Sequence, residues 1–299
     1  MVQEMTLKLE GIFSPMATPL NQDGRINKES AKNLVNFLVD NGVDGLLPLG
    51  TSGEFALLSK EERKVMLECV VDATNGRIPI VAGVSDPSSE NVIQFAKDAK
   101  DVGADAVIAT PPYYFSTTEE GLYSHYKRLS ESIDLPLLVY NIPEWTGLLV
   151  PVNVVKRLAE EKLIVGMKYT QYDFLKLLQF LTECKDKISI FTGSDALAYS
   201  NLEFGGSGGV IGVTNIMPAL ASKVYDEFKK GNLEASKEAQ VKLLPGIEAI
   251  GVGKFPSGLK YAMNSIGLKV GRAKDPLPEL NEDEKSKVRD FLRKAQLVR

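Results

Sequence analysis

The feature that most constrains how this chain folds is a regular alternation of short apolar runs and longer amphipathic segments. The alternation repeats eight times before residue 232. The short runs are apolar throughout, which is typical of strands in a parallel sheet that is covered by helices. Eight such units favour an α/β fold in the form of a (β/α)8 TIM barrel over a doubly wound sheet. The expected strands are residues 11–15, 45–49, 78–82, 104–109, 136–140, 163–168, 188–192 and 209–213.

The amphipathic segments between these runs carry the signals of helices. Ser59 followed by Glu62 is a capping box, which predicts that a helix begins there. In the first segment, Leu34, Val35 and Leu38 fall on one helical face. The expected helices are residues 28–41, 59–73, 88–102, 119–133, 152–161, 173–184, 196–204 and 218–230.

The remainder of the chain predicts a helical tail. We expect residues 1–231 to form the catalytic barrel and residues 232–299 to form a C-terminal extension. No Gly/Ser-rich linker separates the two parts, so the extension is expected to pack on the barrel. Three helices are expected in it, over residues 233–250, 255–266 and 281–295.

Composition and charge exclude several classes of partner. The 299 residues are 44% hydrophobic and 25% charged, which is ordinary for a globular protein. The net charge is −4 and no Lys/Arg-rich stretch occurs, so no nucleic-acid partner is expected. No apolar stretch approaches the roughly 18 residues that span a bilayer. Residues 1–5 lack the pattern of a secretory signal, so we expect a cytoplasmic protein without a membrane partner.

The scarcest residues restrict the chemistry. The chain has one histidine, His125, so a Ser-His-Asp triad would have to use it, and multi-histidine metal sites are excluded. His125 lies within an expected helix, and we expect it at the surface or at an interface. Cys69 and Cys184 form no CxxC pair and are expected to be reduced thiols. Catalysis is therefore expected from Lys, Tyr, Ser/Thr, Asp/Glu and backbone groups.

Polar residues gather where the expected strands end, which is where barrels of this kind carry their active sites. Lys168 closes an apolar run, so it must reach solvent, pair with a carboxylate, or be desolvated as a nucleophile that forms Schiff bases with ketones. Tyr140 ends the preceding strand. It either relays a proton for Lys168 or only forms hydrogen bonds. The other strand ends carry Thr18, Gly50–Glu54, Ser85, Asp86, Pro111–Tyr114, Asn141, Thr170, Gly193–Asp195, Thr214 and Asn215.

The turn Gly50-Thr51-Ser52-Gly53 combines two hydroxyl groups with backbone N–H groups between glycines. Such a turn can bind an anion, for example a carboxylate. It lacks the Lys-Ser/Thr pair of a phosphate-binding P-loop. An ordinary turn is the alternative interpretation.

Three of these segments together resemble the class I pyruvate-dependent aldolases, which include dihydrodipicolinate synthase, N-acetylneuraminate lyase and 2-keto-3-deoxygluconate aldolase. The resemblance covers nearly the whole chain, including the helical tail. It implies a homotetramer of two tight dimers, and neither a metal nor an organic cofactor. The motifs that carry it are Gly50-Thr51-Ser52-Gly53-Glu54, Tyr140-Asn141-Ile142-Pro143 with Thr146-Gly147, and Gly166-Met167-Lys168.

The resemblance also implies roles for single residues. Lys168 would form the Schiff base with pyruvate or with the keto carbon of a 2-keto acid. Tyr140 would be the acid/base that moves protons to and from the substrate oxygen. Thr51 and Ser52 would hold the pyruvate carboxylate and join this proton relay.

Two further positions are similar to family residues outside these motifs. Tyr114 resembles the tyrosine that reaches into the site of a neighbouring subunit, and is therefore expected among the catalytic residues. Ile211 resembles the residue of the eighth strand that lines the pyruvate pocket.

The substrate expectation depends on two departures from one member of the group. Dihydrodipicolinate synthases usually carry an arginine just before the Thr-Gly of the fifth-strand motif, where it binds the carboxylate of aspartate semialdehyde. Trp145 stands there and cannot pair with a carboxylate. Tyr169 stands where those synthases tend to have Glu. Alternatively, Trp145 packs at a subunit interface and says nothing of the substrate.

Thr170 and the segment Gly193-Ser194-Asp195 are similar to the polyol-binding positions of 2-keto-3-deoxygluconate aldolase, so they join Trp145 as expected substrate-binding residues. We therefore expect reversible cleavage of a 2-keto-3-deoxy sugar acid to pyruvate and an aldehyde, in carbohydrate metabolism. N-acetylneuraminate lyase and 4-hydroxy-tetrahydrodipicolinate (dihydrodipicolinate) synthase, which condenses pyruvate with aspartate semialdehyde, are the main alternatives. A keto-deoxy sugar acid dehydratase and a catalytically silent binding protein are less favoured.

Overall fold

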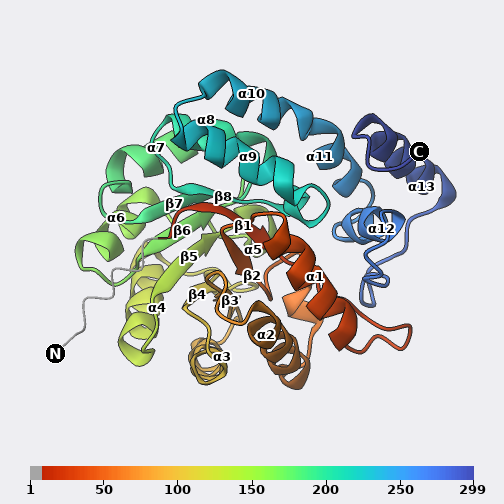
Figure 1. Cartoon of the computed structure of the whole chain (residues 1–299). Coiled ribbons are helices and arrows are strands. Elements are labelled where there is room, and N and C mark those ends of the chain that lie inside the picture. The colour runs from red at the N-terminus through yellow and green to blue at the C-terminus, as the bar shows by residue number, and fades with distance from the viewer. Residues whose placement is uncertain (1–8) are drawn as a thin grey trace.

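Eight parallel strands form a barrel that is surrounded by helices (Figure 1). The computed structural model describes residues 9–299, so the expectation about residues 1–5 lies outside the described part. All strands lie within or beside the expected runs. They are β1 Gly11–Pro15, β2 Gly45–Leu47, β3 Val81–Gly83, β4 Ala106–Ala109, β5 Leu137–Asn141, β6 Gly166–Tyr169, β7 Ser189–Thr192 and β8 Gly208–Val210.

The barrel is closed between β2 and β3. The hydrogen-bonded order runs β2-β1-β8-β7-β6-β5-β4-β3, so these two strands are its ends. Leu46 and Ile80 form a parallel bridge between the ends, and Gly83 donates its N–H to the Pro48 carbonyl at 3.0 Å. The prediction of a (β/α)8 barrel is confirmed.

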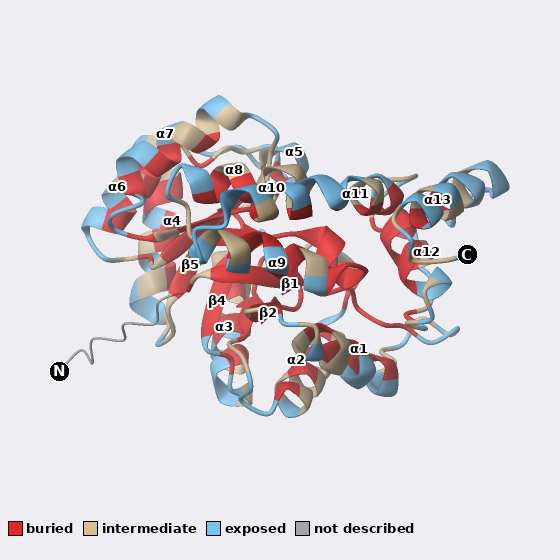
Figure 2. Ribbon diagram, turned by 45° about the horizontal axis from the view of Figure 1, so that its top comes forward, coloured by how far each residue is buried: buried red, intermediate tan, exposed pale blue. Residues whose placement is uncertain are grey.

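Two apolar layers follow from the alternation of side chains along each strand. One layer fills the barrel interior with residues such as Phe13, Leu138 and Phe191. The other lies between the strands and the inner faces of the helices (Figure 2). Gly45 pairs with Phe13 in the strand register, and a Cβ there would lie 2.6 Å from Phe13 Cζ. Because Gly45 has no side chain, the ring of Phe13 can fill this layer of the barrel without a clash.

The helices of the barrel follow the sequence expectation closely, and α1, α2, α3, α4 and α7 begin at a capping side chain. Ser59 and Glu62 form both hydrogen bonds of the predicted capping box. The sequence does not predict the four-residue helix α5, which follows β5 directly and carries Trp145. The helices are α1 Lys28–Asp40, α2 Lys60–Thr74, α3 Ser89–Val102, α4 Glu119–Ser132, α5 Pro143–Thr146, α6 Val152–Glu160, α7 Phe174–Cys184, α8 Ala198–Glu203 and α9 Pro218–Lys229.

The C-terminal extension contains four helices where the sequence predicts three. Pro245 falls in the middle of the first expected helix, and it has no N–H to continue the hydrogen-bonding pattern. That segment is therefore divided in two near Leu243. The four helices are α10 Leu233–Lys242, α11 Leu244–Ile250, α12 Ser257–Ser265 and α13 Glu282–Lys294.

The expected surface position of His125 is wrong. The residue is 7% exposed on the inner side of α4, and its Nδ1 lies 2.9 Å from Ser89 Oγ of α3. Burial lowers the pKa of His125 to about 4. The hydrogen bond with Ser89 allows the imidazole of His125 to be buried between α3 and α4.

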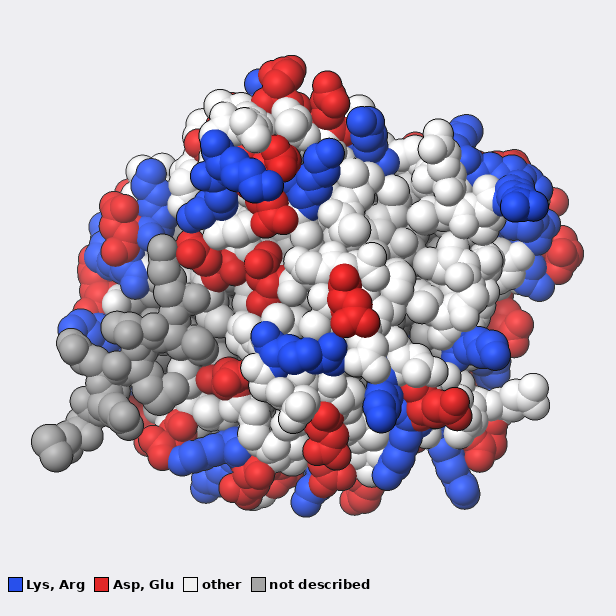
Figure 3. Space-filling view, viewed as in Figure 1, with Lys and Arg blue, Asp and Glu red and all other residues white. Residues whose placement is uncertain are grey.

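Acidic and basic side chains are interspersed over the face seen in Figure 3, with no broad field of one sign. No helix in the described part of the chain is long and apolar enough to cross a membrane.

Candidate active site

Lys168 and Tyr140 face each other inside the mouth of the barrel. They are direct partners in the register of β5 and β6, so both side chains point to the same side of the sheet. Lys168 is 3% exposed, and its Nζ donates a hydrogen bond to Tyr140 Oη at 3.3 Å. The ammonium also lies 4.4 Å from the centre of the tyrosine ring. No carboxylate forms an ion pair with Lys168 within the described residues, which leaves its nitrogen available for bond formation.

Thr51 extends this pair into a chain of three groups. Its Oγ1 lies 2.9 Å from Tyr140 Oη, within hydrogen-bond distance. Because Tyr140 Oη accepts from Lys168, its own proton can be directed to Thr51. Lysine, tyrosine and threonine therefore form a continuous path for a proton from the amine toward the mouth of the barrel.

The turn that carries Thr51 and Ser52 has the form of an anion-binding nest. Among the described residues, the backbone N–H groups of Thr51 and Ser52 have no hydrogen-bond partner. Leu49 and Glu54 flank the turn with φ angles of 61° and 57°, in the left-handed region that few non-glycine residues adopt. Strain of this kind persists only where neighbouring contacts impose it.

An ion pair from the C-terminal extension holds the turn in this shape. Glu54 Oε1 lies 2.5 Å from Nζ of Lys260 on α12, and both side chains are at most 1% exposed. Glu54 Oε2 accepts from the backbone N–H of Lys274 at 2.6 Å. Lys260 also donates to the Arg272 carbonyl at 3.0 Å. The extension therefore fixes the loop on which Thr51 and Ser52 lie.

Thr170 and Gly193 lie against the side chain of Lys168. A Cβ at Gly193 would be 2.6 Å from Lys168 Cε and would also overlap Thr170 Oγ1. Only a glycine leaves room for the lysine in this position. Thr170 Oγ1 is buried and has no hydrogen-bond partner among residues 9–299. It is therefore a free polar group close to the amine.

Ser194 and Asp195 are occupied by hydrogen bonds within the protein. Ser194 Oγ donates to the Gln171 carbonyl at 2.8 Å. Asp195 Oδ1 accepts from the N–H of Val213 at 2.6 Å, at the start of the short 3-10 helix η3 Gly212–Asn215. Burial raises the pKa of Asp195 to about 6. These contacts join the loops after β7 and β8 and use Ser194 Oγ and Asp195 Oδ1.

Two other expected positions point away from Lys168. Ile211 is fully buried, and its side chain belongs to the layer between strands and helices together with Ile12 and Ala198. Tyr169 packs on Phe180 of α7, with ring centres 5.2 Å apart. The side chain of Tyr169 is therefore directed toward α7, although Tyr169 directly follows Lys168 in the sequence.

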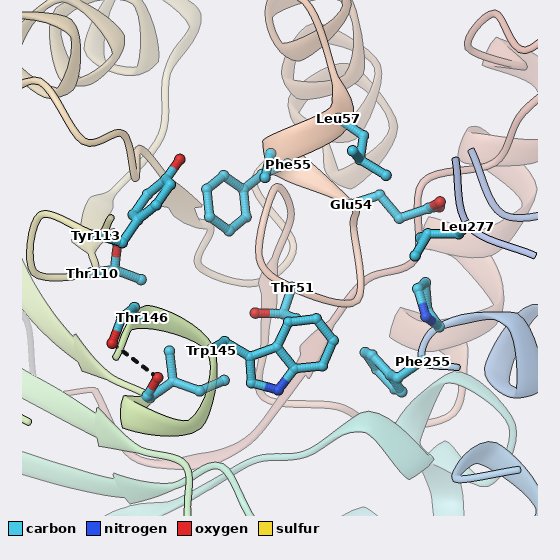
Figure 4. A pocket seen from close by; sticks show the side chains of 13 residues that line it. Thr51, Glu54, Phe55, Leu57, Thr110, Tyr113, Trp145, Thr146, Phe255 and Leu277 are labelled. Carbon is cyan, nitrogen blue, oxygen red and sulfur yellow. Dashed lines mark hydrogen bonds between the residues drawn. The ribbon is translucent and has the colours of Figure 1, made fainter. Parts of the chain in front are cut away.

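A cavity of about 220 Å³ opens beside Thr51, between α5 and the C-terminal extension (Figure 4). Trp145 lines this cavity, and its ring packs edge to face on the ring of Phe255, with ring centres 6.3 Å apart. Thr110 and Tyr113 line the opposite side, toward β4. Phe255 and Thr110 are site residues that the sequence pattern missed, because no motif marks them and only the closed barrel brings them together, whereas Tyr113 lies in the expected strand-end segment Pro111–Tyr114.

Tyr114 lies outside this cavity. It is 89% exposed, has a φ of 83°, and its ring packs on the ring of Phe115 with centres 5.0 Å apart. The structure thus does not bring Tyr114 to Lys168 of its own chain. A surface hollow joins Tyr114 and Phe115 to Trp145.

Known proteins resemble this chain over its whole length. A model of the dihydrodipicolinate synthetase family matches residues 8–295. The 4-hydroxy-tetrahydrodipicolinate synthase of Methanopyrus kandleri is 33% identical over 296 residues, which are 98% of this chain and 99% of that protein.

Solved structures agree with this match. The dihydrodipicolinate synthase of Thermotoga maritima has a TM-score of 0.93 at 32% identity, and the match covers 97% of this chain and 99% of that one. A prophage protein of Escherichia coli K12, described as belonging to the dihydrodipicolinic acid synthase family and solved in complex with pyruvate, has a TM-score of 0.93 at 26% identity, with 97% and 99% covered. The similarity includes the barrel and the helical extension alike.

Proposed function

This chain belongs to the dihydrodipicolinate synthetase family of pyruvate-dependent class I lyases, and from that membership we propose that Lys168 forms a Schiff base with pyruvate and Tyr140 handles the protons of carbon–carbon bond making and breaking. The observation that carries the proposal is the chain of contacts from Lys168 Nζ to Tyr140 Oη at 3.3 Å and on to Thr51 Oγ1 at 2.9 Å.

The reaction needs a group that withdraws electrons from the carbon next to the keto group, and an imine is such a group. The neutral amine of Lys168 attacks the keto carbon of pyruvate, and loss of water leaves a protonated imine. The imine draws electrons from the adjacent methyl group, which loses a proton and becomes the carbon nucleophile of an enamine. That carbon attacks an aldehyde, and Tyr140 gives a proton to the oxygen that gains charge. Hydrolysis of the imine returns Lys168, and the reverse sequence cleaves the product.

The turn at Thr51 and Ser52 binds the carboxylate group of pyruvate in this proposal. Its N–H groups and hydroxyls are suited to the pyruvate carboxylate, which holds the keto carbon toward Lys168. Thr51 returns the proton to Tyr140 after each transfer.

An assay of Lys168→Ala tests this function. Condensation of pyruvate with any accepted aldehyde should fall to background, while Lys156→Ala, an exposed lysine on α6, should retain the full rate. Turnover by the Lys168 variant would remove the lysine from the mechanism.

The finer activity named for the relatives is 4-hydroxy-tetrahydrodipicolinate synthase. Full-length similarity at 33% identity supports condensation of pyruvate with aspartate semialdehyde as one candidate for this chain. The names of these relatives do not support the expected place in carbohydrate metabolism.

Cleavage of a 2-keto-3-deoxy sugar acid is the second candidate. The observation that favours it is the absence of any Lys or Arg among the described residues that line the cavity at Trp145, since aspartate semialdehyde carries a carboxylate. Ser194 Oγ and Asp195 Oδ1 already form hydrogen bonds within the protein, which is an argument against their binding the hydroxyl groups of a sugar acid. Parallel assays with aspartate semialdehyde and with glyceraldehyde separate the two candidates.

A homotetramer remains part of the proposal. The exposed aromatic side chains of Tyr114, Phe115 and Trp145 form a surface that a second copy would cover. Sedimentation at micromolar concentration should give the mass of four chains.

A further inference from the structure

We infer that the cavity at Trp145 is the aldehyde subsite, and that it takes an uncharged aldehyde whose substituent is apolar, of the size of a phenyl ring or a branched alkyl group. The inference rests on the proposed function, since it specifies the second substrate of the same site.

The position of the cavity fits the second substrate. Thr51 lies on its floor and contacts Tyr140, the residue that protonates the aldehyde oxygen, at 2.9 Å. An aldehyde whose carbonyl points toward Tyr140 would therefore extend its substituent toward Trp145 and Phe255 (Figure 4).

The size of the cavity fits a compact substituent. Its volume is about 220 Å³. An apolar protein cavity of about 150 Å³ is large enough to bind benzene. A phenyl or branched alkyl group therefore fits with room for the carbonyl that carries it.

Apolar side chains from two parts of the chain make up much of the cavity wall. Phe55 and Ile142 come from the barrel, and Phe255 and Leu277 come from the C-terminal extension, with Trp145 between them. Rings packed edge to face against a bound ring are favourable contacts. Five of the thirteen lining residues carry side-chain oxygen atoms, but those of Thr51, Thr146 and Glu54 already have partners within the protein.

The charges around the cavity argue against a charged aldehyde. Its only acidic lining residue, Glu54, is already paired with Lys260 and has no exposed side-chain surface. Tyr113 is its other titratable residue, and burial raises the pKa of Tyr113, so it stays neutral. A carboxylate or an ammonium group in this cavity would lose its water without gaining a partner.

The hydroxyl group of Thr110 in the cavity wall is left without a hydrogen-bond partner by the part of the chain that the structure describes. Thr110 Oγ1 is buried and forms no hydrogen bond with the described residues. Buried hydroxyl groups are nearly always satisfied, so this one points to a ligand atom that accepts or donates a single hydrogen bond. The aldehyde oxygen or one hydroxyl on the substituent provides such an atom.

The test compares condensation of pyruvate with four aldehydes: benzaldehyde, 3-methylbutanal, glyceraldehyde and aspartate semialdehyde. We expect kcat/KM for the two apolar aldehydes to exceed that for the other two by about tenfold or more, the ratio that burial of one apolar side group supplies. Preference for aspartate semialdehyde or glyceraldehyde would overturn the inference.

Variants locate the preference in the cavity. Trp145→Arg should lower kcat/KM for benzaldehyde by about tenfold or more and shift the ratio toward aspartate semialdehyde. Phe204→Ala removes another aromatic ring, 47% exposed and outside the cavity, and should leave the ratio unchanged. Thr110→Val should lower kcat/KM and Thr110→Ser should restore it. A ratio that is indifferent to Trp145→Arg would place the aldehyde elsewhere.

Borohydride reduction in the presence of pyruvate alone separates this inference from the proposed function. Trapped pyruvate without use of apolar aldehydes would overturn the aldehyde subsite and leave the Schiff base intact. No trapped pyruvate would overturn the proposed function itself.

Discussion

The environment of Lys168 combines burial with a neutral hydrogen-bond acceptor. Its nitrogen donates to Tyr140 Oη at 3.3 Å, and no carboxylate is in ion-pair contact with it among the described residues. The amine therefore lies beside a hydroxyl group that can exchange protons with it, as attack on a ketone and loss of water require.

Replacing Tyr140 by phenylalanine separates proton transfer from imine formation. Tyr140→Phe should still form the imine with pyruvate but should lower the rate of condensation by about 10²-fold or more, the usual contribution of a positioned acid/base. Stopped-flow detection of the imine and steady-state rates measure the two steps. Tyr126→Phe is the matched control, since that hydroxyl donates to the Ala109 carbonyl at 3.1 Å outside the barrel interior. An unchanged rate for Tyr140→Phe would exclude it from the relay.

A methyl group at Gly193 should displace the reacting amine. Its Cβ would lie 2.6 Å from Lys168 Cε, so the lysine must move by an ångström or so. Such a shift lowers the rate of imine formation by about 10²-fold. Gly251→Ala, where the nearest atom would be 3.5 Å from the new Cβ, is the control. Equal rates for the two variants would mean that Lys168 has space that the structure does not show.

Loops and helix ends determine how much of the site can be read from the sequence. The strands and most barrel helices are predictable from the alternation of apolar runs and amphipathic segments, and capping residues such as Ser59 and Glu62 mark several of the helix starts. Lys168 and Tyr140 are predictable for the same reason, since each closes a strand. The pairing of Glu54 with Lys260 and the position of Phe255 are not, because they depend on how the C-terminal extension folds back over the barrel.

The ion pair between the Thr51 loop and α12 gives a prediction about stability. Lys260→Met leaves the Glu54 carboxylate buried without a counter-charge, which should lower the free energy of unfolding by about 3–5 kcal/mol. The double variant Glu54→Gln with Lys260→Met should recover much of this loss, because a neutral amide still accepts from the Lys274 N–H. Denaturation by urea measures both. An equal loss in the single and double variants would contradict a role of charge here.

The carboxylate that joins the loops after β7 and β8 gives a pH dependence. Burial raises the pKa of Asp195 from 3.8 to about 6, so the folded state binds this proton more tightly than the unfolded state does. The resulting stabilisation is complete below pH 3.8 and is lost as pH rises through about 6.

Asp195→Asn removes this dependence while retaining an acceptor for the Val213 N–H. The Tm of the variant minus the Tm of the wild type should therefore increase as the pH is raised from 4 to 7. Thermal unfolding across this interval checks it. A constant difference in Tm would mean that the pKa of Asp195 is the same in the folded and unfolded states.

At the scale of the whole molecule, the extension and the barrel form one unit around the site. Ser236 of α10 donates to the Val224 carbonyl of α9 at 2.6 Å, Gln240 donates to the Asp195 carbonyl at 3.0 Å, and Lys260 pairs with Glu54. We therefore propose that residues 232–299 serve the catalytic barrel of residues 1–231, by fixing the Thr51 loop and by supplying one wall of the cavity. The sequence pattern alone assigns the extension only to the outside of the barrel.

Trapping the pyruvate intermediate on its lysine tests the Schiff-base mechanism without the need for an aldehyde. The protein is incubated with pyruvate, reduced with borohydride and digested, and the peptides are analysed by mass spectrometry. We expect one reduced pyruvate per chain, attached to Lys168, and none in Lys168→Ala. Pyruvate attached to a different lysine, or full turnover with no attachment at all, would contradict the Schiff-base mechanism.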